Sequence, residues 1–162
     1  MLSKILNVVD AAEPRQLDET VVGLPRPWVF TNGVFDILHR GHVEYLDDAA
    51  ALGASLIVGL NSDTSARMLD KGVDRPFNKD CDRAVLLSGL ASVSVTIMFD
   101  EPTPSALLSR IRPDIYVKGG DYDVETLEET MLVRSWGGDA RSILYRTGFS
   151  TTDLVARIRA GS

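Results

Sequence analysis

The chain has 162 residues, and 44% of them are hydrophobic, which is enough to build one domain with a substantial core. Its formal net charge of −6 argues against a general nucleic-acid or acidic-membrane surface, so a phosphate site would have to be a local positive region. A single cysteine, Cys81, cannot form an internal disulfide, and no apolar run reaches the length of a membrane span. With no signal-peptide pattern at the start, these features predict a cytoplasmic protein.

The chain order predicts alternating strands and helices. Residues 1–27 hold three prolines and a short helical pattern at 18–22, and are expected to form an N-terminal extension on a domain spanning 28–162. Short apolar runs predict five buried parallel strands at 28–31, 55–60, 93–99, 114–117 and 142–145. Amphipathic patterns predict helices at 41–53, 63–69, 80–91, 103–111, 125–136 and 151–160. Parallel neighbours need crossover connections, so the predicted fold is α/β, a doubly wound five-stranded parallel sheet in a single domain.

The only two histidines of the chain, His39 and His42, follow the first of these strands and begin the next helix. At such a junction ligands bind, and the unpaired N–H groups of the helix favour an anion such as phosphate. Imidazoles can donate hydrogen bonds to phosphate oxygens, and Gly41 between them leaves room for a close approach. For an isolated pair of histidines, packing and solvation remain the commoner explanation.

Polar segments also follow the second strand. Asp63, at the end of Asn61-Ser62-Asp63, can cap a helix or contact a ligand, and the pattern does not decide between the two. Residues 70–79 are charged and aperiodic, a loop from which Lys71 and Arg75 can close over phosphates; for Lys71 alone a solvated position is the simpler explanation. Arg83, on the following helix, can form a salt bridge or contact phosphate.

Two later segments have the same character. Lys118 ends the fourth strand, and the adjacent Gly119 and Gly120 allow a sharp turn and a close approach of the backbone to a ligand. Ser150-Thr151-Thr152 begins the last helix, where hydroxyl and N–H groups suit phosphates and also have capping spacing.

The ordered motifs resemble one family. His39-Arg40-Gly41-His42, preceded by the segment 31–36, is similar to the HxGH signature of the cytidylyltransferase-like nucleotidyltransferases. The segments 61–63, 75–78, 118–122 and 150–152 resemble, in this order, the sugar-phosphate adenylyltransferase branch that makes ADP-heptose from heptose 1-phosphate for lipopolysaccharide. The resemblance implies a Rossmann-like HUP nucleotidyltransferase fold from about residue 28 to the end.

The resemblance also implies the reaction and the roles of the residues. ATP and a heptose 1-phosphate would give ADP-heptose and pyrophosphate, with Mg²⁺ arriving with the triphosphate and no dedicated metal ligands. The catalytic residues would be His39, His42 and Lys118. The nucleotide-binding residues would be Thr31, Asn32, Gly33, Phe35, Gly41, Asn61, Asp63, Arg75, Gly119, Ser150, Thr151 and Thr152. The sugar-phosphate-binding residues would be Asp36, Gly120 and Asp121. A homodimer or higher homo-oligomer is expected, without nucleic acid or membrane as a partner.

The chain departs from the family at Ala50. Similar enzymes usually carry lysine or arginine eight positions after the second histidine, and this residue is expected to reach the triphosphate. Ala50 therefore leaves open the alternative of a catalytically weakened nucleotide-binding module. A second alternative is a cytidylyltransferase that acts on a polyol or amino-alcohol phosphate, because the choice of base depends on a pocket that the sequence does not show. The exact sugar phosphate, its anomer and the choice between ATP and CTP do not follow from the residues.

Overall fold

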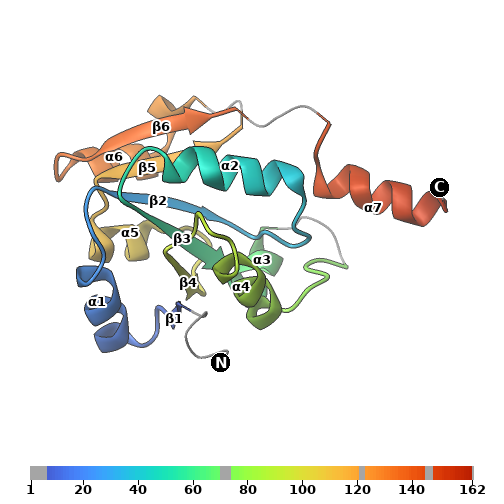
Figure 1. Ribbon diagram of the computed structural model, residues 1–162, viewed down its shortest axis with the longest axis horizontal. Coiled ribbons are helices and arrows are strands. Elements are labelled where there is room, and N and C mark those ends of the chain that lie inside the picture. Colours follow the sequence, from blue (N-terminus) through green and yellow to red (C-terminus); the bar gives the residue numbers. More distant parts are fainter. Residues whose placement is uncertain (1–6, 70–73, 121–122, 145–147, 162) are drawn as a thin grey trace.

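The structure, a computed structural model, describes residues 7–69, 74–120, 123–144 and 148–161. Its centre is a parallel sheet in the order β1-β4-β3-β2-β5-β6, with every neighbouring pair parallel (Figure 1). The strands are β1 (Val8–Asp10), β2 (Trp28–Gly33), β3 (Ser55–Asn61), β4 (Val95–Phe99), β5 (Ile115–Gly119) and β6 (Asp139–Ile143).

The predicted α/β class with a parallel sheet is confirmed, but the predicted number of five strands is wrong. The sixth strand, β1, lies within the segment 1–27 and pairs with β4 through Val8 and Thr96. It has only three residues, too short for hydrophobic periodicity to reveal it. The helix expected at 18–22 also begins earlier, at Pro14, where proline suits the first helical turn.

Helices cover both faces of the sheet (Figure 1). On one face, α1 (Pro14–Val22), α5 (Ser105–Ile111) and α6 (Glu128–Arg134) pack on Phe30, Ile57 and Tyr116. On the other face, α2 (Arg40–Ala50) and α4 (Asp80–Ser88) pack on Val29, Val58 and Val117. Because side chains alternate along a strand, both sets of strand residues are buried, which explains the continuous apolar runs of β2 and β3.

Two predicted boundaries are displaced for local reasons. The strand expected at 142–145 is β6, which starts at Asp139; this edge strand buries only Ala140, so its sequence lacks an apolar run. The helix expected at 125–136 divides into a short 3₁₀ helix η2 (Val124–Thr126) and α6, because Leu127 has an extended backbone. The remaining helices are α3 (Asp63–Met68) and α7 (Thr151–Ala160), close to the predicted ranges.

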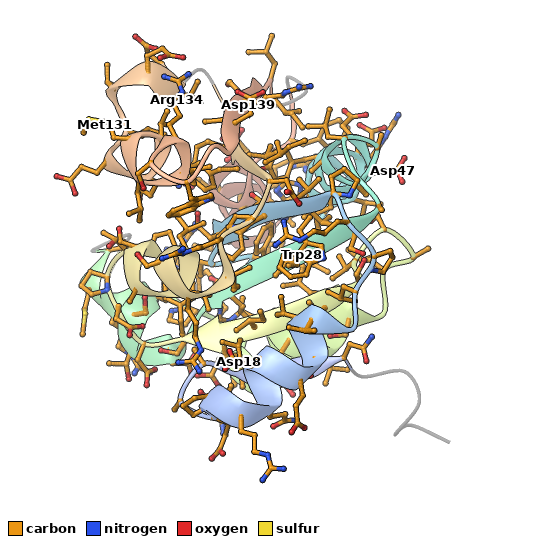
Figure 2. All side chains as sticks on the ribbon, turned by 90° about the vertical axis from the view of Figure 1, so that its left-hand side faces the viewer. Asp18, Trp28, Asp47, Met131, Arg134 and Asp139 are labelled. Atoms are coloured by element: carbon orange, nitrogen blue, oxygen red, sulfur yellow. The ribbon has the colours of Figure 1, made fainter. Side chains whose placement is uncertain are left out.

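The two ends of the sheet differ in character. Figure 2 looks at the end where the strands begin: Trp28, the first residue of β2, lies near the middle, and the labelled Asp47, Arg134 and Asp139 lie at the outside. At the opposite end the strands run out toward α7, which projects from the layered body (Figure 1) and has no buried residue. The polar residues predicted for the site gather at this second end.

Candidate active site

A cleft of about 810 Å³ opens at the carboxyl ends of the strands. Small-molecule sites typically measure about 300–1,000 Å³, so the cleft is large enough for a nucleotide and a second substrate. It brings together most of the predicted site residues: Asn32, Gly33, Phe35, Asp36, His39, His42, Asn61, Arg75, Lys118, Gly119, Ser150, Thr151 and Thr152. Segments from β2, β3, β5 and α7 therefore converge at one place.

The two histidines form a stacked pair at the start of α2. Their ring centroids are 3.8 Å apart with an interplanar angle of 18°, and Phe35 meets His42 edge-on at 5.3 Å. His39 occupies the N-cap position, yet its side chain makes no capping hydrogen bond. Burial lowers the pKa of His39 below its ordinary value of 6.5, so its imidazole is neutral at neutral pH. A neutral imidazole still offers one N–H group to a phosphate oxygen.

Gly41 and Thr31 do not line the cleft; they pack behind the residues that do. A Cβ atom on Gly41 would lie 2.8 Å from Cβ of Phe149 and 3.1 Å from the His39 ring, so the absence of a side chain is needed for packing. The Thr31 hydroxyl is fully buried and lies 2.6 Å from the phenol oxygen of Tyr45 on α2. Both residues thus fix the beginning of α2 against β2.

The sequence left open whether Arg83 forms a salt bridge or contacts phosphate, and in the structure it forms a salt bridge. Its guanidinium is completely buried and donates to Oδ1 of Asp63 at 2.8 Å. It also donates to the backbone carbonyls of Val34, Asn61 and Asn78 at 2.7, 2.8 and 3.0 Å. Asp63 is therefore a partner of Arg83 and does not line the cleft; the N-cap of α3 is Ser62.

Asp36 joins the start of α2 to the segment after Arg75. Its Oδ1 accepts hydrogen bonds from the backbone N–H groups of Phe77 and Asn78 at 2.8 and 3.0 Å. The Asn78 amide donates back to the Asp36 carbonyl at 2.7 Å. Asp36 is 5% exposed, and its Oδ2 has no hydrogen-bond partner among the residues that the structure describes.

The beginning of α7 also lines the cleft, and Phe149, just before it, packs beside Gly41 at the start of α2. Ser150 caps the helix, because its Oγ accepts from the N–H groups of Thr152 and Asp153 at 3.1 and 3.4 Å. Arg75 donates to the Thr152 hydroxyl at 3.4 Å, which brings its positive charge to the same part of the cleft. Hydroxyl groups and one guanidinium thus gather in the same cleft as the histidine pair.

Only part of the segment at the end of β5 lines the cleft. Lys118 and Gly119 line the cleft. Gly120 lies beside β6 instead: its N–H donates to the Ile143 carbonyl, and its carbonyl accepts from Ser142. Asp121, expected to bind the sugar phosphate, and Lys71 lie outside the described residues.

Several residues at the cleft carried no signal in the sequence. Phe149 and the segment 102–104 line it, although apolar and proline residues indicate no particular chemistry. Glu129 also lines it, but in sequence it is indistinguishable from an ordinary acidic residue in the first turn of a helix. Only the placement of the start of α6 beside β5 reveals it.

Ala50 belongs to the other end of α2. Ten residues separate it from Arg40, about 15 Å along a helix axis, and it packs against the core on the α2 face. It does not line the cleft. In this chain, position 50 therefore contributes no charge to the cleft.

The fold and the cleft together define a nucleotide-binding α/β domain that has its ligand site at the carboxyl ends of the strands. Residues 30–157 match the sequence model of the family described as Cytidylyltransferase-like. The chain therefore belongs to the cytidylyltransferase-like family and is a nucleotidyltransferase. Within the described residues, no helix combines the length and apolar character needed to cross a membrane.

The chain is similar to proteins of known name over most of its length. It is 59% identical over 138 residues to the D-beta-D-heptose 1-phosphate adenylyltransferase of Bordetella bronchiseptica, and the matched region covers 85% of each chain. It is 49% identical over 131 residues to the bifunctional protein HldE of Pseudomonas aeruginosa, of which it spans 28%.

Solved structures resemble the fold. A lipopolysaccharide core biosynthesis protein from Thermoplasma volcanium has a TM-score of 0.62 with 29% identity, over 74% of this chain and 95% of that one. A pantoate-beta-alanine ligase from Francisella tularensis has a TM-score of 0.61 with 14% identity, over 95% of this chain and 77% of that one, and supports the fold alone.

Proposed function

We propose that the chain transfers AMP from ATP to a heptose 1-phosphate and forms ADP-heptose and pyrophosphate, a step of lipopolysaccharide core synthesis. The observation that carries the proposal is the 59% identity to a heptose 1-phosphate adenylyltransferase across 85% of both chains. The cleft agrees with it, because histidines, a lysine and hydroxyl groups from separate segments line one cavity. The names of these relatives favour neither the cytidylyltransferase alternative nor the weakened module.

In this reaction, an oxygen of the sugar phosphate attacks the α-phosphorus of ATP while the bond to pyrophosphate breaks. Both reactants are anions, so the protein must hold them together and place donors around the transferring group. His39, kept neutral by burial, and His42, stacked on it at the start of α2, donate N–H groups to phosphate oxygens there. Lys118, at the end of β5, supplies the positive charge that lowers the repulsion between the two substrates.

The leaving pyrophosphate fits the part of the cleft at the start of α7. Thr151 and Thr152 offer hydroxyl groups there, and the positive end of the α7 helix dipole favours an anion. Arg75 already lies there through its contact with Thr152. Negative charge that accumulates on the departing group would meet the Arg75 guanidinium and the helix start.

Mg²⁺ fits the cleft as a companion of the triphosphate. No group of three His, Cys, Asp or Glu side chains in the described parts of the chain has a metal-binding arrangement. Mg²⁺ in nucleotide sites commonly takes one or two carboxylates together with phosphates and water, and the unpartnered Oδ2 of Asp36 is a carboxylate oxygen at the cleft. When bound, Mg²⁺ would neutralise phosphate charge. The proposal includes a cytoplasmic location and a homodimer or higher homo-oligomer, which sedimentation equilibrium tests.

The experiment is an assay of pyrophosphate release with ATP or CTP, each combined with D-beta-D-heptose 1-phosphate, glycerol 3-phosphate or phosphocholine. We expect rapid release only with ATP and the heptose 1-phosphate. Release that requires CTP would assign the chain to the cytidylyltransferase alternative. Nucleotide binding by calorimetry without release for any pair would contradict an enzymatic role.

A further inference from the structure

The cleft has two sides, set by the two faces of the sheet. Asn32 pairs with Gly59, two residues before Asn61, and Phe30 pairs with Tyr116. Because side chains alternate along each strand, both asparagines lie on the same face as Tyr116. That face is covered by α1, α5 and α6, whereas the histidine pair belongs to α2 on the opposite face. The asparagines therefore line the α6 side of the cleft. Lys118, two residues after Tyr116 on β5, shares this face, but the mechanism above gives no task to the asparagines or to Glu129.

On this side, Asn61 presents an unused acceptor. The Glu101 carbonyl can only accept, so the Ser65 hydroxyl donates to it at 2.6 Å. Ser65 in turn accepts from Nδ2 of Asn61 at 2.9 Å, which fixes the orientation of the amide. Oδ1 of Asn61 is left buried, with no partner among the described residues, on a side chain that is 2% exposed and lines the cleft. A buried acceptor without a partner is costly, so a ligand donor is expected there.

Asn32 presents the complementary group. Its Oδ1 accepts from the phenol of Tyr116 at 3.2 Å. Burial, followed by the nearby carboxylate of Glu129, raises the pKa of Tyr116, so the phenol keeps its proton and remains a donor. With its oxygen engaged, the Asn32 amide offers its N–H groups to the cleft.

Glu129 completes the set. It lies in the first turn of α6, is half-buried and lines the cleft. It forms no hydrogen bond or ion pair with another described residue, apart from its electrostatic effect on Tyr116. A carboxylate repels phosphate but accepts strongly from hydroxyl groups. Lys118 on this face serves the phosphates in the mechanism above. The other groups, two acceptors and one amide donor, match hydroxyl groups, which both donate and accept, better than an ionised phosphate, which only accepts.

We propose that the α6 side of the cleft is the subsite for the hydroxyl-bearing part of the acceptor, held by Glu129, Asn61 and Asn32, and that Glu129 determines specificity for it. The inference rests on the proposed function, since it names where the sugar of that reaction binds. It assigns the two asparagines to the sugar rather than to the nucleotide. Glu129 acts on binding and takes no part in the transfer of the nucleotidyl group.

The experiment compares Glu129→Gln and Glu129→Ala with Glu128→Gln, a control on the exposed face of the same helical turn. Steady-state pyrophosphate release is measured with ATP and D-beta-D-heptose 1-phosphate, each varied in turn. Loss of one charged hydrogen bond corresponds to about tenfold or more in KM. We expect this increase in the KM for the heptose 1-phosphate in Glu129→Ala, a smaller one in Glu129→Gln, and none in Glu128→Gln. The KM for ATP and kcat stay unchanged.

Three results separate the possible failures. Wild-type protein that releases no pyrophosphate contradicts the proposed function itself. Active wild-type protein with an unchanged acceptor KM in Glu129→Ala contradicts only the subsite. An increase in the KM for ATP, or a lower melting temperature together with changes in every kinetic constant, also contradicts it, because Glu129 would then serve the nucleotide or the fold.

Discussion

The two helix starts at the cleft, those of α2 and α7, are held in very different ways. α2 is fixed by the core: Leu46 and Ala49 are fully buried, and Tyr45 bonds Thr31 below the histidine pair. α7 has no buried residue and is held mainly by Arg75 on Thr152 and by an exposed ion pair between Arg159 and Asp74. The start of α2 is thus a fixed wall of the phosphate site, packed into the core, while the start of α7 is an attached wall, held by exposed contacts. Changes to the first should cost stability or chemistry, and changes to the second should cost binding.

The largest effect on this comparison is expected from Arg83, which holds the segment between β2 and the start of α2. Arg83→Met leaves Asp63 and three backbone carbonyls without their buried donor. We expect a loss of about 3–5 kcal/mol in the free energy of unfolding, measured by urea denaturation. Arg110→Ala, which removes an exposed ion pair with Asp18, is the control and should cost at most about 1 kcal/mol. Equal losses in the two variants would show that the buried arginine does not support the wall.

On the same wall, His42→Ala removes a donor without removing the helix. Loss of one preorganised donor typically lowers kcat by about 10²- to 10³-fold, and we expect that effect on pyrophosphate release. The urea midpoint should change little, because the alanine keeps α2 intact. A variant that retains more than about a third of wild-type kcat would be incompatible with the proposed role of His42.

The attached wall is tested by Thr152→Val, which removes a hydroxyl and keeps the shape of the side chain. We expect the KM for ATP to rise by about three- to tenfold, the value of one ordinary hydrogen bond, with an unchanged urea midpoint. Thr64→Val, at an exposed threonine of α3 that lies outside the cleft, is the matched control and should leave both quantities unchanged. A fall in the urea midpoint for Thr152→Val would mean that α7 belongs to the folded core after all.

The pH dependence of stability probes His39. Because burial lowers its pKa, the unfolded chain binds a proton at pH values where the folded chain does not. The contribution of His39 to stability is therefore present above its ordinary pKa and is lost as pH falls through about 6.5 toward the lower folded value. His39→Gln should flatten the decrease in unfolding free energy between about pH 7.5 and pH 5.5. An identical slope in the variant would contradict the assignment.

The smallest effect is expected at the far end of α2. Ala50→Lys restores the residue type usual in the family, but position 50 packs against the core and lies away from the cleft. We expect kcat and the KM for ATP to stay within about twofold of wild type, since no contact with phosphate is created. A clear gain in turnover would show that this helix end does reach the triphosphate.

The sequence alone determined the alternation of strands and helices and the clustering of polar residues after strands. Period-two and period-3.6 patterns arise from burial of one face at a time, so they are visible without coordinates. For that reason β2, β3 and α7 are close to their predicted ranges, and thirteen of the predicted site residues line the cleft. The sequence did not predict β1, because three residues are too few to show a periodic pattern. It also did not predict the break before α6, because one residue with an extended backbone leaves the pattern unchanged.

Tertiary structure decided which polar groups serve the cleft and which serve the fold. Asp63 and Asn61 are two residues apart in sequence, yet Asp63 neutralises a buried arginine and Asn61 keeps a free acceptor at the cleft. The positions of Glu129 and Ala50 were also decided by the fold. Glu129 lines the cleft because α6 begins there, whereas Ala50 lies at the far end of α2, outside the cleft. A local pattern records whether a residue is polar, but its partners come from distant segments, and only folding brings these into contact.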